Sequence, residues 1–202
     1  MAPPPKNIFV PILQLNSYTD DDYLCSLYAN LLANSMNKQC NNHAHPSFIE
    51  TIRQLSPSEA LLLKTGKLLI SDIATCEIRY QEQSSYSNTN KWVLHPKNII
   101  RNTNPGITIY KYYIPDIPNI PLPELQIMIE NFIRLSLITC PSNKILLSKD
   151  AYIHFYKSQL SEQLENQYMN SIELNNQSEI AHIPHYLEPT AYGKSFYEIC
   201  VK

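Results

Sequence analysis

Glycine is scarce in this sequence, which has only three in 202 residues: Gly66, Gly106 and Gly193. Phosphate-binding loops need several residues that adopt positive φ or let a phosphate approach the backbone. The scarcity therefore excludes Gly-rich nucleotide loops as a class, and the sequence also has no G-x-S-x-G nucleophile turn. Fifteen prolines, with many Asn and Ser residues, must supply the turns.

Basic runs and long apolar runs are also missing. The net charge of −2 argues against a protein held on nucleic acid mainly by counterion release. No apolar run approaches the roughly 20 residues that a membrane span needs. The opening residues Met-Ala-Pro-Pro-Pro-Lys do not resemble a targeting sequence. We therefore expect a soluble, cytoplasmic protein with no membrane span in this chain.

The five cysteines are odd in number, widely spaced and without a C-x-x-C pair. This usage is typical of free thiols in a reducing cytosol.

Residues 27–63 carry the most distinctive pattern and predict three helices joined by two capped turns. The second helix opens at His45-Pro46, since proline loses nothing at a helix start. The third opens at Ser56-Pro57, where Ser56 and Glu59 can form a capping box. The apolar positions on one face of the first two helices are Leu24, Leu27, Tyr28, Leu31, Leu32, Met36, Phe48, Ile49, Ile52 and Leu55.

Ahead of these helices, residues 1–16 are expected to be extended because of their prolines. The apolar strip 8–13 must then be covered, either by the helix face 24–36 or by a second copy of the chain. Ser17 or Thr19 is expected to cap the first long helix. Asp20, Asp21 and Asp22 would complement its dipole rather than chelate a metal, because consecutive helical residues point in different directions.

The third helix is expected to end near Gly66. Beyond it, β-branched and aromatic residues predict strands at 73–80 and 107–114, separated by an exposed loop at 81–90 and a short apolar piece at 92–94. The proline-rich run 115–123 is interpreted as a stiff connector.

The last part predicts a helix at 122–138, a short strand at 144–147, a helix at 150–167 and an extended segment at 179–187. A final helix at 190–201 is capped by Thr190. This order resembles a winged helix. The sequence therefore predicts a mainly α protein with some β (α+β). We divide it into an N-terminal helical bundle at 1–70, a strand-containing middle with the Pro-rich connector at 71–120, and a winged-helix-like half at 121–202.

The sequence gives little support for a metal site or for a nucleophilic cysteine. His43 and His45, or His182 and His185, could form a zinc site with Cys40 and Cys200, but the spacings are irregular and His45-Pro46 is explained as a helix start. Cys40 lies in a polar region near two histidines, yet the sequence shows no activating base pattern. We name no catalytic, cofactor-binding or metal residue and expect no cofactor, and an enzyme with an unrecognised Cys/His site is kept as an alternative.

A DNA-reading helix should present Arg, Lys, Asn or Gln outward. The polar positions of 122–138 are slightly acidic: Glu124, Gln126, Glu130, Asn131 and Arg134. Arg134 is interpreted as a packing residue that pairs with Glu130, four positions earlier. The pattern favours a protein-interaction module over a nucleic-acid-binding winged-helix regulator, which is the runner-up.

Two stretches taken together resemble the abortive infection alpha family of bacterial phage-defence proteins. The first combines LYANLLAN at 27–34 with HPSF at 45–48, QLSP at 54–57 and the Glu59-Ala60 pair. The second combines NFIRLSLI at 131–138 with TAYGKSF at 190–196 and the late Cys200. Ser136 stands where the family usually has Gly, and Pro189 where it usually has Leu. The family also commonly has a further N-terminal region ahead of the Pro-rich opening, and whether this chain is a fragment without that region is left open.

The resemblance implies a part in stopping phage propagation, and it carries over no catalytic residue. Our leading interpretation is a non-enzymatic component of abortive infection defence that binds a phage or host protein. Homo-oligomerisation is left open. The family-motif residues are expected to be structural: Asn30, His45, Pro46, Phe48, Ser56, Pro57, Arg134, Gly193 and Phe196.

Overall fold

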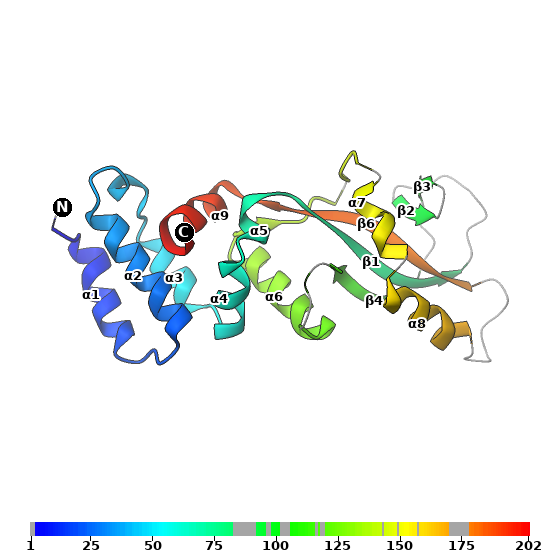
Figure 1. Cartoon of the computed structure of the whole chain (residues 1–202), viewed down its shortest axis with the longest axis horizontal. Helices are drawn as coiled ribbons and strands as arrows, with labels where there is room; N and C mark the ends of the chain where they lie inside the picture. Colours follow the sequence, from blue (N-terminus) through cyan, green and yellow to red (C-terminus); the bar gives the residue numbers. More distant parts are fainter. Residues whose placement is uncertain are drawn as a thin grey trace. The chain divides into compact units, whose positions relative to one another are not determined.

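The computed structural model describes residues 3–82, 92–95, 98–101, 106–115, 117, 120–142, 144–148, 150–156, 158–169 and 178–202. Helices and an antiparallel sheet make up the described chain, so it is an α+β protein (Figure 1). Two compact units are present. Unit 1 comprises Met1–Asp72, Phe132–Thr139 and Glu188–Lys202, and unit 2 comprises Ile73–Asn131 and Cys140–Leu187. Both units are discontinuous in sequence, and residues of the expected 121–202 range belong to each of them.

Unit 1 is built mainly from short helices. They are α1 (Lys6–Asn16), α2 (Asp22–Met36), the 3₁₀ helix η1 (Asn41–His43), α3 (Ser47–Arg53), α4 (Pro57–Lys64), α5 (Lys67–Ile70), α9 (Ala191–Phe196) and the terminal π-helix η2 (Tyr197–Val201). It also holds the end of α6 (Leu122–Arg134) and the two-residue strand β5 (Ile138–Thr139). The helices expected within 24–63 are confirmed.

Residues 6–16 are helical, so the extended interpretation of the N-terminus was wrong. Ile8 and Ile12, four residues apart, are both buried, and α1 lies against α2 and α3. Pro11 stands inside this helix, where a proline costs about 3 kcal/mol. Burial of two isoleucines, at roughly 1.5–3 kcal/mol each, offsets that cost.

The cap of α2 also differs from expectation. The Asp21 carboxylate accepts hydrogen bonds from the backbone N–H groups of Tyr23 and Leu24, each at 3.0 Å. Ser17 and Thr19 instead donate to carbonyl oxygens at the end of α1, at 2.6 and 3.0 Å. The hydroxyls therefore terminate one helix, and the carboxylate starts the next.

The start and end of α4 are as expected. The Ser56 hydroxyl accepts from the Glu59 N–H at 3.3 Å, and the Glu59 carboxylate accepts from the Ser56 N–H at 2.7 Å, which completes the capping box. Gly66 has φ +71°, and the short helix α5, which the sequence did not predict, begins directly after it.

Unit 2 contains an antiparallel sheet with strand order β3-β2-β6-β1-β4. The strands are β1 (Ile73–Glu82), β2 (Trp92–His95), β3 (Asn98–Arg101), β4 (Gly106–Tyr113) and β6 (Ser178–Pro189). β1 and β6 pair without interruption from Ile73–Leu187 to Glu82–Ser178. The strands expected at 73–80 and 107–114 are confirmed, and the segment expected to be extended at 179–187 lies in β6. Gln81, expected in a loop, is buried in β1, and residues 83–90 of that loop lie outside the described residues.

Helices α7 (Asp150–Tyr156) and α8 (Gln159–Met169) replace the single helix expected at 150–167. The break occurs at Ser158, whose hydroxyl accepts from the Ser161 N–H at 3.3 Å and so starts a second helix. Residues 144–147 form no strand, and α6 ends at Arg134 rather than 138.

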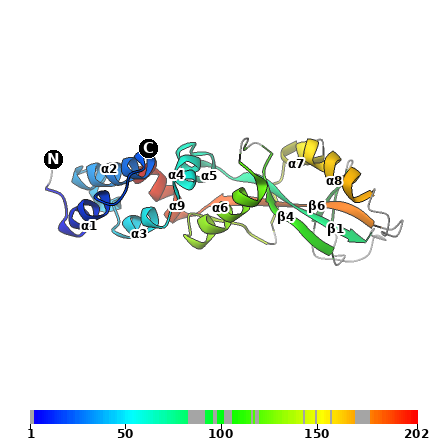
Figure 2. The ribbon, with the colours of Figure 1, turned by 90° about the horizontal axis from the view of Figure 1, so that it is seen from below.

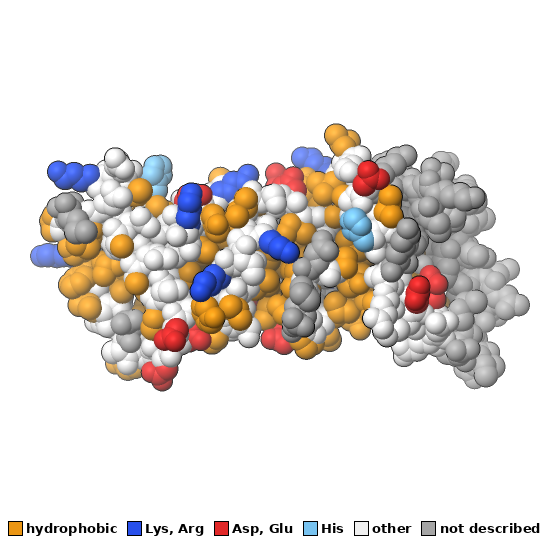
Figure 3. Space-filling view, in the orientation of Figure 1, with side chains coloured by type: hydrophobic (Ala, Val, Ile, Leu, Met, Phe, Trp, Pro, Cys, Tyr) orange, Lys and Arg blue, Asp and Glu red, His pale blue; other side chains and the backbone are white. Residues whose placement is uncertain are grey.

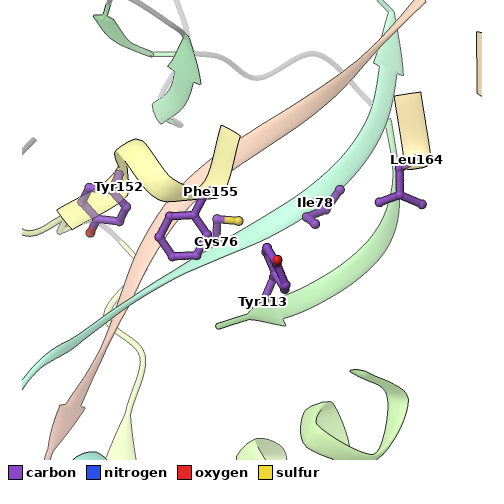
Figure 4. Close-up of a cluster of buried hydrophobic side chains, with 6 residues drawn as sticks. All are labelled: Cys76, Ile78, Tyr113, Tyr152, Phe155 and Leu164. Carbon is purple, nitrogen blue, oxygen red and sulfur yellow. The ribbon is translucent and has the colours of Figure 1, made fainter. Parts of the chain in front are cut away.

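Both α7 and α8 lie on one side of β1 and β6 (Figure 2). Beneath them is a core cluster of six buried residues, shown in Figure 4: Cys76, Ile78, Tyr113, Tyr152, Phe155 and Leu164. The opposite face of β1 carries Thr75, Glu77, Arg79 and Gln81, because side chains alternate along a strand. Strand β1 therefore has an apolar face under the helices and a polar face behind them, while neighbouring β6 places the buried Ala181 and Ile183 on that second face.

A winged-helix arrangement of 121–202 is not confirmed. The long strand β6 pairs mainly with β1, which comes from the expected middle segment. Within 121–202 the strand pairing among described residues is that of β5 with the end of β6, over two residues.

Candidate functional site

Family-motif residues of unit 1 hold its separate segments together. Asn30 and Asn34 lie one turn apart on α2 and donate side-chain hydrogen bonds to the carbonyl oxygens of Cys200 and Ile199, at 3.0 and 2.8 Å. These carbonyls belong to the π-helix η2 at the end of the chain. Two amides of α2 therefore satisfy acceptors of the C-terminal helix.

A polar cluster joins the start of α3 to α9. His45 Nδ1 accepts from the Ser47 N–H at 3.1 Å and lies 2.7 Å from the Ser47 hydroxyl. The Tyr192 hydroxyl lies 3.1 Å from Ser47 Oγ and 2.7 Å from Thr51 Oγ1. Next to this cluster, the buried Phe48 ring lies 5.2 Å from that of Tyr192 and 5.5 Å from that of Phe196, between centroids. The HPSF motif thus supplies both a helix start and an aromatic contact with the TAYGKSF motif.

The end of α6 forms a third contact of motif residues. The Leu137 N–H donates to the Phe132 carbonyl and the Ser136 N–H to the Ile133 carbonyl, each at 2.9 Å, and Ser136 has φ +57°. This is a Schellman ending, in which the left-handed position usually holds glycine. The position where the family usually has Gly is therefore one that requires positive φ.

Thr190 and Gly193 both lie against the backbone at this end of α6. The Thr190 hydroxyl lies 2.5 Å from the Ser136 carbonyl oxygen and also accepts from the Gly193 N–H at 2.9 Å. A Cβ atom added to Gly193 would lie 1.9 Å from the Leu137 carbonyl oxygen. Only glycine fits against the backbone at this position.

Arg134, the last residue of α6, donates to the Gln54 side chain at 2.8 Å. Glu130, the partner that the sequence suggested for Arg134, pairs with Lys111 at 3.3 Å. The Lys111 N–H also donates to the Gln126 side chain at 3.0 Å, so two polar residues of α6 are engaged with β4.

A charged cluster on the polar face of β1 was missed by sequence reasoning. The Glu77 carboxylate accepts from Arg79 Nε and Nη2, at 3.0 and 2.6 Å, and from the Thr108 hydroxyl at 2.6 Å. His185 Nε2 lies 3.8 Å away. Burial raises the pKa of Glu77, but the interactions with His185, Thr108 and Arg79 outweigh it and bring the pKa to about 2. The alternation Thr-x-Glu-x-Arg along 75–79 was the available signal.

A buried serine–histidine pair lies on the opposite face. Ser161 Oγ is 2.7 Å from His182 Nε2, within the range for a nucleophile and its base. However, both side chains are buried, and Ser161 Oγ also lies 2.8 Å from the Phe155 carbonyl oxygen and 3.0 Å from Ser158 Oγ. The pair joins the sheet to the α7–α8 junction and presents no open face to a substrate.

The candidate metal ligands belong to different units: Cys40, His43, His45 and Cys200 to unit 1, and His182 and His185 to unit 2. Within the described parts of the chain, no three His, Cys, Asp or Glu side chains gather as a metal site would require. Among the same residues, no helix has the length and apolar character needed to cross a membrane.

Comparison with known proteins identifies a family. The family model described as abortive infection alpha matches residues 1–200. No curated protein and no solved structure matches the chain.

Proposed function

Because this chain belongs to the abortive infection alpha family, we propose that it is a non-enzymatic component of bacterial antiviral defence that acts by binding a phage or host protein. The family match over residues 1–200 is the observation that carries the proposal. We place this activity in the cytoplasm, where the free thiols of the chain stay reduced.

The use of the motif residues supports a structural role for them. Asn30, Phe48, Ser56, Gly193 and Phe196 are all engaged in caps, close approaches or core contacts within unit 1. Side chains that contact other parts of the same chain in this way are not available to contact a substrate. The motif is therefore proposed to maintain the fold on which a binding surface is displayed.

Exposed apolar side chains support binding to another protein. Those most exposed among the described residues are Tyr18, Ile107, Ile127 and Leu147. Single exposed apolar residues are common, so a binding surface has to be found by experiment.

The nucleic-acid alternative has less support. Gln126 and Glu130 on α6 are engaged with Lys111, and Lys and Arg side chains stand singly on the face shown in Figure 3. Affinity for nucleic acid depends on clustered cations. A gel-shift titration at low salt should show weak binding without sequence preference, and sub-micromolar binding that is lost in Arg134→Ala would favour the alternative.

Phage challenge tests the main proposal. Bacteria that express the chain should give fewer plaques, and infected cells should stop growing before phage are released. Gly193→Ala, which should disrupt the fold, is expected to abolish protection, whereas Ser195→Ala on the same helix should retain it. A tagged chain should capture the same protein in repeated infections. Full plaque numbers with the folded, expressed wild-type chain would contradict the proposal.

A further inference from the structure

His182 lies on β6, the middle strand in the sheet order of unit 2. In the sheet register it lies opposite Ile78 of β1 and Leu94 of β2, and its side chain is fully buried. Its Nε2 atom contacts Ser161 Oγ, which in turn lies within hydrogen-bond distance of the Phe155 carbonyl at the end of α7 and of Ser158 at the start of α8. One imidazole ring therefore connects the sheet to the junction of both covering helices.

A further connection between these helices and the sheet is made by the Tyr152 hydroxyl and two backbone groups. The Tyr152 hydroxyl donates to the His185 carbonyl at 2.9 Å and accepts from the Leu146 N–H at 3.0 Å. Burial raises the pKa of Tyr152 to about 12, so of these two side chains only His182 can change its charge in mild acid.

The other ionisable groups around His182 are of two kinds. Thiol and phenol groups share its face of the sheet: Cys76 and Tyr80 from β1, Tyr110 and Tyr113 from β4, and Tyr186 from β6 itself. Tyr152 of α7 belongs to the same cluster, while Asp150 and His154 of α7 and Glu162 and Glu165 of α8 are exposed. The side chains of β2 lie outside the described residues. Glu77, Arg79 and His185 lie on the opposite face, since side chains alternate along each strand.

An imidazolium at this position would be a buried charge, which an apolar interior disfavours. Burial accordingly lowers the pKa of His182 to about 4. Any conformation that opens the site to water restores an ordinary histidine pKa of about 6.5 and is favoured by acid. Because α7 and α8 cover the apolar cluster that contains Cys76, opening there would expose that thiol (Figure 4).

We propose that His182 is a pH-sensitive latch within unit 2, whose protonation releases helices α7 and α8 from the sheet while unit 1 stays folded.

Cysteine labelling of the full chain tests the latch. Cys76 and Cys200 are both buried, one in unit 2 and the other in unit 1, so Cys200 serves as an internal control. Labelling by 4,4′-dithiodipyridine, which reacts in mild acid, is followed by peptide mass spectrometry and normalised to a free peptide thiol at the same pH. Between pH 7 and pH 5 the population of the open state should rise about 20-fold, from a pKa of about 4 when closed and about 6.5 when open. Cys76 labelling should rise by this factor and Cys200 labelling should stay constant.

His182→Gln provides the matched variant, because its amide reaches Ser161 but does not titrate. Cys76 labelling in this variant should lose its pH dependence, whatever its rate at pH 7. An unchanged pH dependence in His182→Gln would overturn the proposal. So would a flat wild-type profile at Cys76, or an equal rise at Cys200, which would mean that the whole chain unfolds. The wild-type comparison of the two thiols is decisive even if the variant does not fold.

Discussion

At the scale of single residues, Ser136 holds a backbone conformation that its side chain disfavours. Its φ of +57° is the only positive value at a non-glycine residue in the described part of the chain. A left-handed conformation costs an L-residue roughly 1–2 kcal/mol, and glycine avoids this cost while losing more entropy on folding. Ser136→Gly should therefore stabilise the protein by about 1 kcal/mol in urea unfolding. Ser71→Gly is the control, because Ser71 has an ordinary φ of −143° and the change should give no gain.

Gly193 is constrained by the atoms packed around it, whereas Ser136 is constrained by its φ angle. Helix propensity alone would favour alanine there by about 1 kcal/mol. The added Cβ would nevertheless meet the Leu137 carbonyl oxygen at 1.9 Å, and this backbone atom cannot move without disturbing the α6 ending. Gly193→Ala should lower the free energy of unfolding by about 1–3 kcal/mol or more. Ser195→Ala should change it little, and an equal loss in both variants would argue against the steric explanation.

At the scale of elements, α1 depends on the side chains that it buries. Ile8 is 2% exposed and Val10 is 48% exposed, so neighbouring positions of one helix give a matched pair. Ile8→Ala should cost about 2–5 kcal/mol, and Val10→Ala should stay within about 0.5 kcal/mol. Thermal unfolding followed by circular dichroism measures both. A large loss in Val10→Ala would instead indicate that the outer face of α1 is covered, as in the alternative with a second copy of the chain.

The start of α2 depends on one carboxylate. Asp21 accepts two backbone hydrogen bonds, whereas Asp20 is exposed ahead of the helix. Asp21→Ala should therefore cost about 1 kcal/mol, the usual loss of a helix cap, and Asp20→Ala should cost much less. Urea unfolding of the two variants checks the assignment, which would be wrong if they lost equal stability.

At the scale of the whole molecule, acid should weaken unit 2 through Glu77. Its folded-state pKa of about 2 lies below the ordinary value of 4.5, so its stabilising contribution is present above pH 4.5 and is lost as the pH falls toward 2. The shift corresponds to about 3 kcal/mol. Glu77→Gln should be less stable at pH 7 and should have a flatter stability profile between pH 4.5 and 2. Urea unfolding followed by circular dichroism at each pH measures the two profiles. A profile as steep as that of the wild type would exclude Glu77 as the cause.

The sequence by itself determined the family and the features that depend on near neighbours. The Ser56–Glu59 capping box, the Thr190 cap and the strands β1 and β6 follow from residue types within a few positions of one another. The caps are local interactions, and the positions of the strands follow from the residue types along each segment, although the pairing of β1 with β6 does not.

The tertiary structure decided the rest, because the deciding contacts join residues far apart in the chain. Pro11 is tolerated in α1 because Ile8 and Ile12 are buried by other helices, and no local pattern contains that burial. The Asn30–Cys200 contact, the Ser161–His182 pair and the Glu77 cluster form only when distant segments meet. The two discontinuous units have the same origin, since each compact core is assembled from segments that the chain order separates.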